Sequence, residues 1–237
     1  MGAAPSSGAI LFTMKDLFYK PLKINGKDDS ILFWSDLHIN HGCERWPTPL
    51  WKKRGFNSLE EYNEGIIKRW NEKVKQTDTV FNLGDIVFSK GAYENLVKLL
   101  NRLNFDTMYL MPGNHTAGFK QLFESLESNI YVINENKRVV FVPNYLEAFV
   151  NGQPIVMSHY AILSFNGQAK GSWMIHGHSH GSLYNSEVGK EIYKGKVMDV
   201  GVEKCPYPIS FGELRKEFRD VQATSFDHHT KDTQNPF

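Results

Sequence analysis

Polar side chains that can bind metal ions follow five short apolar runs of this 237-residue sequence. The apolar runs are Ile31–Trp34, Thr79–Leu83, Thr107–Met111, Ile155–Met157 and Trp173–Ile175. The blocks that follow them are Ser35-Asp36-Leu37-His38, Gly84-Asp85, Pro112-Gly113-Asn114-His115, Ser158-His159 and His176-Gly177-His178-Ser179-His180. Carboxylate, amide and imidazole groups gathered in this way are typical ligands of a borderline divalent metal.

The histidines of the chain are concentrated in these blocks. Seven of the nine lie in or next to a block, namely His38, His41, His115, His159, His176, His178 and His180, and only His228 and His229 lie near the C-terminus. A single Asp-x-His pattern is a weak signal, because most such patterns decorate a surface. Five blocks after five apolar runs are hard to explain by packing alone, so the sequence predicts a metal centre.

The elements that would position these residues can be predicted from apolar periodicity. The five runs are short and rich in β-branched or aromatic residues, which favours buried strands. A helix begins after Ser58, where Ser58 and Glu61 form a capping-box pattern. An apolar residue then recurs every fourth position, at Tyr62, Ile66, Trp70 and Val74. A second helix is predicted over 92–103. Strands that alternate with helices indicate an α/β fold, in which functional sites lie at the carboxyl ends of strands.

Composition and charge exclude several classes of protein. With 41% hydrophobic and 22% charged residues, the chain is an ordinary globular one. A formal net charge of +1 requires neither nucleic acid nor an anionic membrane as partner. No apolar run approaches the ~18 residues of a membrane span. Cys43 and Cys205 lie far apart and form no CxxC pattern, which favours a reducing cytoplasm. We expect one domain over residues 30–221, with an N-terminal extension (1–29) and a polar C-terminal tail (222–237).

The ordered blocks resemble the motifs of the calcineurin-like metallophosphoesterases. The order is Asp-x-His, Gly-Asp, Gly-Asn-His, His and Gly-His-x-His, and it is most similar to the compact single-domain phage and bacterial members. The resemblance covers roughly residues 31–215. It implies a two-sheet β-sandwich flanked by helices, the four-layer αββα arrangement, with two metal ions at one edge.

The resemblance also implies a role for each residue. Asp36, His38 and His180 would hold the first ion, and Asp85 would bridge the two ions. The ligands of the second ion would be Asn114, His159 and His178, and His115 would correspond to the family's proton-donating histidine. Mn²⁺ is the favoured metal, and Fe, Zn²⁺, Ni²⁺ and Co²⁺ also suit mixed nitrogen and oxygen ligands.

The expected activity is hydrolysis of a phosphodiester or a nucleotide-type phosphoester. Two divalent ions and two carboxylates leave a surplus of about two positive charges, which would attract a phosphate and stabilise its transition state. Metals ~3.5–4 Å apart can share a water and lower its pKa, so the bridging hydroxide would attack in line. The expected partner is a small diester or nucleotide substrate. A nuclease acting on DNA or RNA and a non-catalytic metal-binding scaffold stay open as alternatives.

Some positions depart from the family pattern or have two readings. Thr116 follows the Gly-Asn-His block, where the family often has an acidic residue. Residues 86–88 lack the carboxylate that protein phosphatases use to orient their histidine, which argues against a protein phosphatase. What aligns His115 is therefore open. His41 could contact substrate or pack a loop, and His176 could support the ligands or be structural. Asn40 and Asp199 are candidates for contacts behind the ligands.

The segment from residue 45 to 54 combines two tryptophans with four cations directly after the first block. Its sequence is Arg45-Trp46-Pro47-Thr48-Pro49-Leu50-Trp51-Lys52-Lys53-Arg54. Interleaved cations and aromatic rings can hold a nucleotide through phosphate contacts and base stacking. The favoured reading is simpler, namely a loop attached to the core by its tryptophans with solvated charges.

Overall fold

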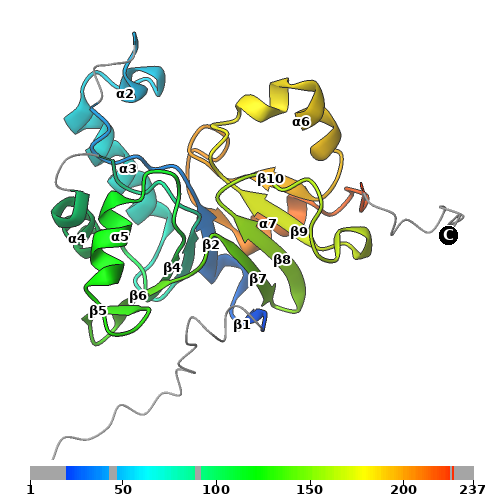
Figure 1. The fold of residues 1–237 in the computed structure, drawn as a ribbon, viewed down its shortest axis with the longest axis horizontal. Helices are drawn as coiled ribbons and strands as arrows, with labels where there is room; N and C mark the ends of the chain where they lie inside the picture. Colours follow the sequence, from blue (N-terminus) through cyan, green and yellow to red (C-terminus); the bar gives the residue numbers. More distant parts are fainter. Residues whose placement is uncertain (1–19, 43–46, 89–91, 225, 227–237) are drawn as a thin grey trace, which may run out of the picture.

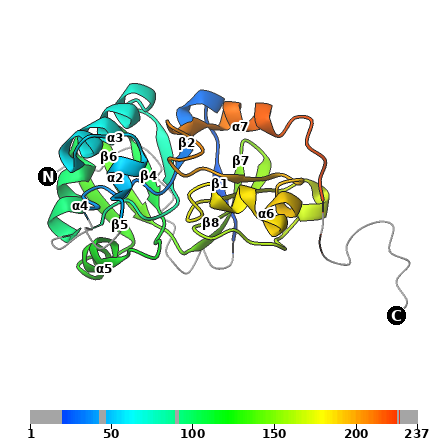
Figure 2. The same ribbon diagram turned by 90° about the horizontal axis from the view of Figure 1, so that it is seen from above.

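The structure is a computed structural model that describes residues 20–42, 47–88, 92–224 and 226. Two β-sheets pack face to face in the middle of the molecule, and helices cover their outer sides (Figure 1, Figure 2). The two-sheet sandwich expected from the sequence is thereby confirmed. Within the described residues, none of the helices is long and apolar enough to cross a membrane.

The six-stranded sheet carries three of the five predicted strands. Its order is β11 (Ile209–Ser210), β2 (Ile31–Trp34), β3 (Thr79–Asn82), β4 (Thr107–Leu110), β6 (Lys137–Phe141) and β5 (Ile130–Asn134). The four central strands are parallel, and the two edge strands pair antiparallel to their neighbours.

The five-stranded sheet carries the other two predicted strands. Its order is β1 (Leu22–Ile24), β7 (Tyr145–Val150), β8 (Gln153–Ser158), β9 (Trp173–His176) and β10 (Val197–Asp199). Only β7 and β8 pair antiparallel. Strand β1 lies inside the N-terminal extension expected over residues 1–29, yet it pairs with β7. Residues 22–24 are therefore part of the sheet. Most of the expected C-terminal tail lies outside the described residues.

Helices form the outer layers of the molecule. They are α2 (Leu50–Lys53), α3 (Leu59–Lys73), α4 (Ala92–Arg102), α5 (Ala117–Glu124), α6 (Glu187–Ile192) and α7 (Phe211–Glu217), with the short turns η1 (Asp28–Ser30), η2 (Gln168–Lys170) and η3 (Ser182–Asn185). Helices α3, α4 and α5 lie on the side of the six-stranded sheet, and α6 lies on the side of the other sheet (Figure 1).

Helix α3 begins where the sequence predicts it, but its cap differs in one detail. The Ser58 hydroxyl accepts the Glu61 N–H at 3.0 Å. The Glu61 carboxylate does not return the bond; it accepts the backbone and side-chain N–H groups of Asn57. The predicted apolar stripe is buried along its whole length, so it attaches α3 to the six-stranded sheet.

The register of the parallel strands brings their ends level. Phe33, Phe81 and Tyr109 are register partners on β2, β3 and β4, and their rings stack with centroids 5.2 and 4.8 Å apart. Cross-strand aromatic pairs of this kind each stabilise a sheet by roughly 0.2–1 kcal/mol and specify its register. Because the three strands end level, the polar blocks that follow them emerge at one edge.

Candidate metal centre

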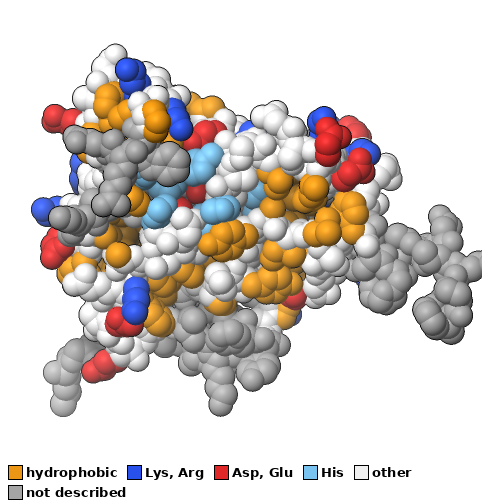
Figure 3. Space-filling view, turned by 45° about the horizontal axis from the view of Figure 1, so that its top comes forward, with side chains coloured by type: hydrophobic (Ala, Val, Ile, Leu, Met, Phe, Trp, Pro, Cys, Tyr) orange, Lys and Arg blue, Asp and Glu red, His pale blue; other side chains and the backbone are white. Residues whose placement is uncertain are grey.

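All eight predicted site residues meet at the edge formed by the carboxyl ends of β2, β3, β4, β8 and β9. Figure 3 shows histidine and acidic side chains together in a hollow between the two halves of the molecule. A cavity of about 660 Å³ opens here, and six of the eight line it: His38, Asp85, Asn114, His115, His178 and His180. The other two, Asp36 and His159, are fully buried beneath it.

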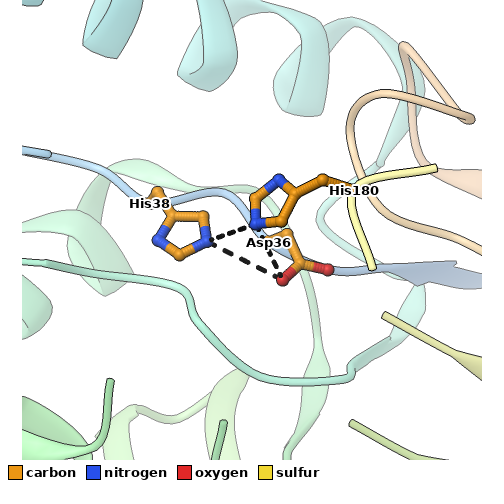
Figure 4. A group of neighbouring side chains, drawn as sticks. All are labelled: Asp36, His38 and His180. Carbon is orange, nitrogen blue, oxygen red and sulfur yellow. Dashed lines mark hydrogen bonds and ion pairs between the residues drawn. The ribbon is translucent and has the colours of Figure 1, made fainter. Parts of the chain in front are cut away.

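The residues predicted to hold the first metal form one cluster (Figure 4). The Nε2 atoms of His38 and His180 lie 3.2 Å apart. Oδ1 of Asp36 lies 3.7 Å from Nε2 of His38 and 3.9 Å from Nε2 of His180. Three ligand atoms from two distant segments of the chain therefore face a common point.

Asp85 lies between the first cluster and the predicted ligands of the second metal. Its Oδ2 atom is 3.6 Å from Nε2 of His38 and 3.5 Å from Nε2 of His159. Its Oδ1 atom accepts the backbone N–H of His115 at 2.8 Å. One carboxylate oxygen thus faces imidazoles of both groups, as a bridging ligand would.

The second group gathers around the side-chain oxygen of Asn114. That Oδ1 atom lies 3.0 Å from Nε2 of His159 and 2.8 Å from Nδ1 of His178. The other ring nitrogen of His159 donates to the Leu83 carbonyl at 2.8 Å. This bond fixes the ring, so that Nε2 points toward Asn114 and Asp85.

His115 lies at the rim of the cavity. Its side chain is 34% exposed, and Nε2 is 3.9 Å from Oδ2 of Asp85. Its ring meets Phe88 edge to face, with centroids 4.5 Å apart at 84°, and meets His38 at 5.3 Å and 70°. An aromatic contact therefore holds this ring where protein phosphatases use a carboxylate. The absence of a carboxylate at residues 86–88 is visible in the sequence, but the contact between Phe88 and His115 is visible only in the fold.

Comparison with known proteins decides the family. Residues 30–205 match the calcineurin-like phosphoesterase family. The chain belongs to this family. It is 30% identical over 183 residues to the uncharacterized protein MJ1445 of Methanocaldococcus jannaschii, covering 77% of this chain and 87% of the relative. The crystal structure of AQ665, a protein of unknown function from Aquifex aeolicus, has the same fold, with a TM-score of 0.56 at 20% identity, covering 79% of this chain and 98% of that one.

The family implies divalent metal ions, and the donor set of this phosphoesterase fits them. Oδ1 of Asp36 is buried and has no hydrogen-bond partner among the described residues. Leaving such an acceptor unpaired costs roughly 1–3 kcal/mol or more for a charged group. The imidazole nitrogens of His38 and His180 that approach each other could not both carry protons without repulsion. A cation at this point would satisfy all three atoms, so the protein is a metal-dependent phosphoesterase.

Electrostatics keep the carboxylates charged. Burial raises the pKa of Asp36, but the neighbouring His38, His159 and His180 outweigh burial and hold this pKa below its usual value. The pKa of Asp85 is also lowered, because His159, His38 and the backbone N–H of His115 outweigh burial. Both side chains are therefore anionic at neutral pH, as carboxylate ligands of a divalent metal must be.

The histidines divide into two classes. Burial lowers the pKa of His38 and of His178, so these rings are neutral near pH 7. Burial would lower the pKa of His159 and of His180 as well. Nearby carboxylates outweigh burial, however: Asp85 raises the pKa of His159 above its ordinary value, and Glu203 does the same for His180. A raised pKa means that these two rings bind a proton more strongly than a free imidazole does, and a metal ion at the predicted site would compete with that proton for the ring nitrogens.

Backbone strain is concentrated at the same residues. Among the described non-glycine residues, positive φ angles occur at Asp36, His38, Asn40, Asp85, Asn151, His178 and His180, and five of these seven are predicted metal ligands. Such conformations cost roughly 1–3 kcal/mol each and cluster at functional sites. Two glycines allow the close packing that this requires. A Cβ at Gly113 would lie 2.0 Å from Oδ1 of Asp85, and one at Gly177 would lie 2.4 Å from Oδ2 of Asp36.

His41 and His176, for which the sequence allowed two roles each, lie in different surroundings. His41 lines the cavity and stacks on Phe88 with ring centroids 4.1 Å apart. Its Nδ1 atom has no hydrogen-bond partner among the described residues, and burial lowers its pKa to about 4. His176 is buried between the Gly177 carbonyl and the Tyr193 hydroxyl, and both of its ring nitrogens are engaged there. The structure therefore favours a structural role for His176.

Two polar residues behind the centre hold loops rather than ligand side chains. Asn40 bonds to Asn63 on α3 through its backbone N–H and its side chain. Asp199 accepts the hydroxyl of Ser179 at 2.5 Å and the backbone N–H groups of Gly181 and Gly201. Asp199 thus fixes the turn that carries His178 and His180.

The tryptophan-rich segment is attached to the core in its described part. Trp51 is partly buried and packs against the main core. Arg45 and Trp46 lie outside the described residues. Arg54 is almost fully buried and pairs with Glu203, so it does not offer a solvated charge to a phosphate. Glu203 also accepts from His180, a contact that the sequence did not suggest because the two residues lie 23 positions apart, with α6 and β10 between them.

Proposed function

We propose that this phosphoesterase binds two divalent ions and hydrolyses a small phosphodiester or nucleotide-type phosphoester. The observation that carries the proposal is the position of Asp85. Its Oδ2 atom lies within 3.6 Å of imidazole nitrogens from both predicted ligand groups. A site for one ion would need only one of these groups, whereas a shared carboxylate between two groups supports a pair of ions.

The residues present give each ion a complete set of protein donors. Asp36, His38 and His180 would hold the first ion and Asn114, His159 and His178 the second, with Asp85 shared. When bound, two such ions supply an activated water and positive charge that stabilises the phosphate in the transition state. Mn²⁺ is the metal we favour, and Fe, Zn²⁺, Ni²⁺ and Co²⁺ suit the same donors.

His115 is the residue we propose as proton donor to the departing oxygen. It is partly exposed to the cavity, whereas the ligand rings of His38 and His159 are buried. Phe88 holds the ring on one side, and the backbone N–H is bonded to Asp85. Among the described residues, the ion-pair partner of this ring is the carboxylate of Asp85, and the ring lines the cavity in which a substrate would lie.

The cavity supports a small substrate. Its volume of about 660 Å³ falls in the range of small-molecule sites. Its outer wall combines the polar Thr48, Lys53 and Ser182 with the apolar Leu50. A nuclease for long DNA or RNA would present an extended basic surface, but the formal charge is only +1 and Arg54 is paired with Glu203. We also propose a cytoplasmic location, because Cys205 is a buried free thiol.

The proposal can be tested with metal-stripped protein to which each metal is added back. Bis(p-nitrophenyl) phosphate, p-nitrophenyl phosphate, cyclic nucleotides and a single-stranded oligonucleotide would serve as substrates. We expect metal-dependent hydrolysis of the diesters, with the oligonucleotide much slower. Hydrolysis of the monoester alone would contradict the diester assignment, and cleavage of the oligonucleotide at a comparable rate would favour the nuclease. Metal binding without turnover on any substrate would favour the scaffold.

A further inference from the structure

We infer that Glu203 and Arg54 are positioning residues for the first ligand group, Asp36, His38 and His180. Neither belongs to the predicted ligand set; both line the same cavity and contact residues of this group. The inference rests on the proposed function in one respect, namely that this group binds an ion. It adds two residues, 149 positions apart in the chain, that set how well the ion is held.

Glu203 controls the ring of His180. Its Oε1 atom lies 2.7 Å from Nδ1 of His180. Arg54 Nη2 also lies 3.3 Å from this nitrogen, but the contact with Glu203 is much closer. Because a carboxylate oxygen can only accept a hydrogen bond, we assign the proton to Nδ1, and the neutral ring then keeps its lone pair on Nε2. Nε2 is the atom that faces Asp36 and His38. The carboxylate therefore selects the tautomer and the ring orientation that bind a metal, as carboxylates behind histidine ligands do.

Arg54 controls the backbone that carries the other two ligands. Its Nη2 atom donates to the carbonyl of Asp36 at 2.9 Å, and Nη1 donates to the carbonyl of Leu37 at 3.3 Å. Both carbonyls belong to the turn in which Asp36 and His38 have positive φ angles. The hydroxyl of Tyr62 on α3 also donates to the Leu37 carbonyl and accepts from Arg54. The guanidinium thus supports a strained turn at two successive peptide groups.

The two positioning residues are linked to each other. Arg54 donates to Oε1 of Glu203 through Nε at 2.9 Å and through Nη2 at 2.7 Å. The Arg54 side chain is only 4% exposed and that of Glu203 is 23% exposed. A buried guanidinium needs a paired anion, and here the pair joins the 36–38 turn to the turn that carries His180. This ion pair therefore links the two segments of the first group, beside the hydrogen bond from the His178 backbone N–H to Oδ2 of Asp36 at 2.9 Å.

The second ligand group has a different support. His159 is held by the Leu83 carbonyl, and Asn114 lies between His159 and His178. None of these three contacts involves Arg54 or Glu203. Loss of the ion pair should therefore weaken the first ion far more than the second, which a general loss of stability would not do.

The test compares Glu203→Gln and Arg54→Lys with the surface variant Arg102→Gln. Arg102 forms a bidentate ion pair with Glu64 between exposed side chains of α4 and α3. Its variant therefore loses an arginine–glutamate pair away from the metal centre. Calorimetric titration of metal-free protein with Mn²⁺ gives the two affinities, and His180→Ala and Asn114→Ala identify which step belongs to which group. We expect the first affinity to fall roughly 10–100-fold in Glu203→Gln and Arg54→Lys. The second affinity should stay within a factor of about three, and Arg102→Gln should change neither.

A second readout needs no metal. In ¹H–¹⁵N spectra of the metal-free protein, at a pH where the ring is neutral, His180 should be the Nδ1–H tautomer. In Glu203→Gln it should shift toward the Nε2–H form. Equal losses at both metal sites, or an unchanged tautomer with an unchanged first affinity, would overturn the positioning role. A wild-type protein that binds no ion would overturn the proposed function itself, so the two failures are distinguishable.

Discussion

The backbone N–H of His115 donates a hydrogen bond to Oδ1 of Asp85 at 2.8 Å. One oxygen of this carboxylate is thereby held by the chain, and the other is left to face His38 and His159. The bond also ties the loop of the proposed proton donor to the proposed bridging ligand. Because the bond uses the main chain of His115, its side chain can be changed without releasing Asp85.

The first prediction follows from that separation of main chain and side chain. His115→Ala should retain its full metal content yet lose activity, because general acid catalysis contributes typically 10²–10⁴-fold. The loss should be largest on alkoxide or ribose leaving groups, which need a proton. A nitrophenolate leaves without much help, so p-nitrophenyl esters should be least affected.

Steady-state rates on a matched pair of diesters, together with metal analysis, check this prediction. Equal losses on both leaving groups would instead indicate a role in binding the phosphate. Loss of metal from His115→Ala would show that the ring is a ligand.

The second prediction concerns Phe88, whose ring holds that of His115 edge to face. Phe88→Ala should keep the metals and reduce the rate by up to roughly 100-fold, the effect of a misplacement of about 1 Å. It should show the same leaving-group dependence as His115→Ala. Phe149→Ala, which removes an exposed ring from β7, is the matched control and should leave the rate unchanged. A Phe88→Ala variant with the wild-type rate would contradict this positioning.

Much of the centre could be predicted from the sequence, because each predicted ligand lies within a few residues of the strand that positions it. Strand β2 has the predicted bounds, and the other four predicted runs overlap observed strands within two residues at either end. Continuous apolar runs mark buried strands, and each ligand block directly follows one. Parallel strands in register then bring the blocks together.

Other strands contain short apolar stretches but are not followed by a block of possible metal ligands. Strand β7 alternates exposed and buried residues over Tyr145–Val150, which makes its pattern weaker than that of a fully buried strand. Strand β6 begins with the charged pair Lys137 and Arg138. The roles of Arg54 and Glu203 could not be predicted either, because their contact joins segments 149 residues apart. In the sequence Arg54 is one of four cations in a segment, and only the fold shows that it is buried.

The third prediction concerns pH. In the metal-free protein the pKa values of His159 and His180 are raised above their ordinary value of 6.5 by Asp85 and Glu203. Protons and metal compete for these rings, so metal affinity should fall as pH falls through the raised pKa values, beginning above pH 6.5. Metal uptake near pH 7 should release protons.

Titration calorimetry in buffers of different ionisation enthalpy measures that release. Excess metal should restore activity lost at mildly acidic pH, because it shifts the competition. An affinity that stays constant between pH 8 and pH 5.5 would contradict histidine ligation.

The fourth prediction separates packing from substrate binding in the segment around Trp51. Because Trp51 packs against the core, Trp51→Ala should lower the melting temperature and affect nucleotide and methyl phosphodiester substrates equally. If a base stacked on this ring, the variant would instead lose ~1–3 kcal/mol of nucleotide binding alone. Binding of the two substrate classes, measured beside thermal unfolding, decides between them. The same measurements on Trp46→Ala test the second tryptophan of the segment, which lies outside the described residues.

The central claim is that Asp85 is shared by two ions, and metal content tests it most directly. Metal-free protein would be loaded with Mn²⁺, desalted and analysed for bound metal per chain. We expect two equivalents in the wild type, a loss from both sites in Asp85→Asn, and a loss mainly from the first in His180→Ala. Asp78→Asn, a buried aspartate whose side chain bonds to the backbone of Lys75, is the control and should keep two. Two full equivalents in Asp85→Asn would contradict the account.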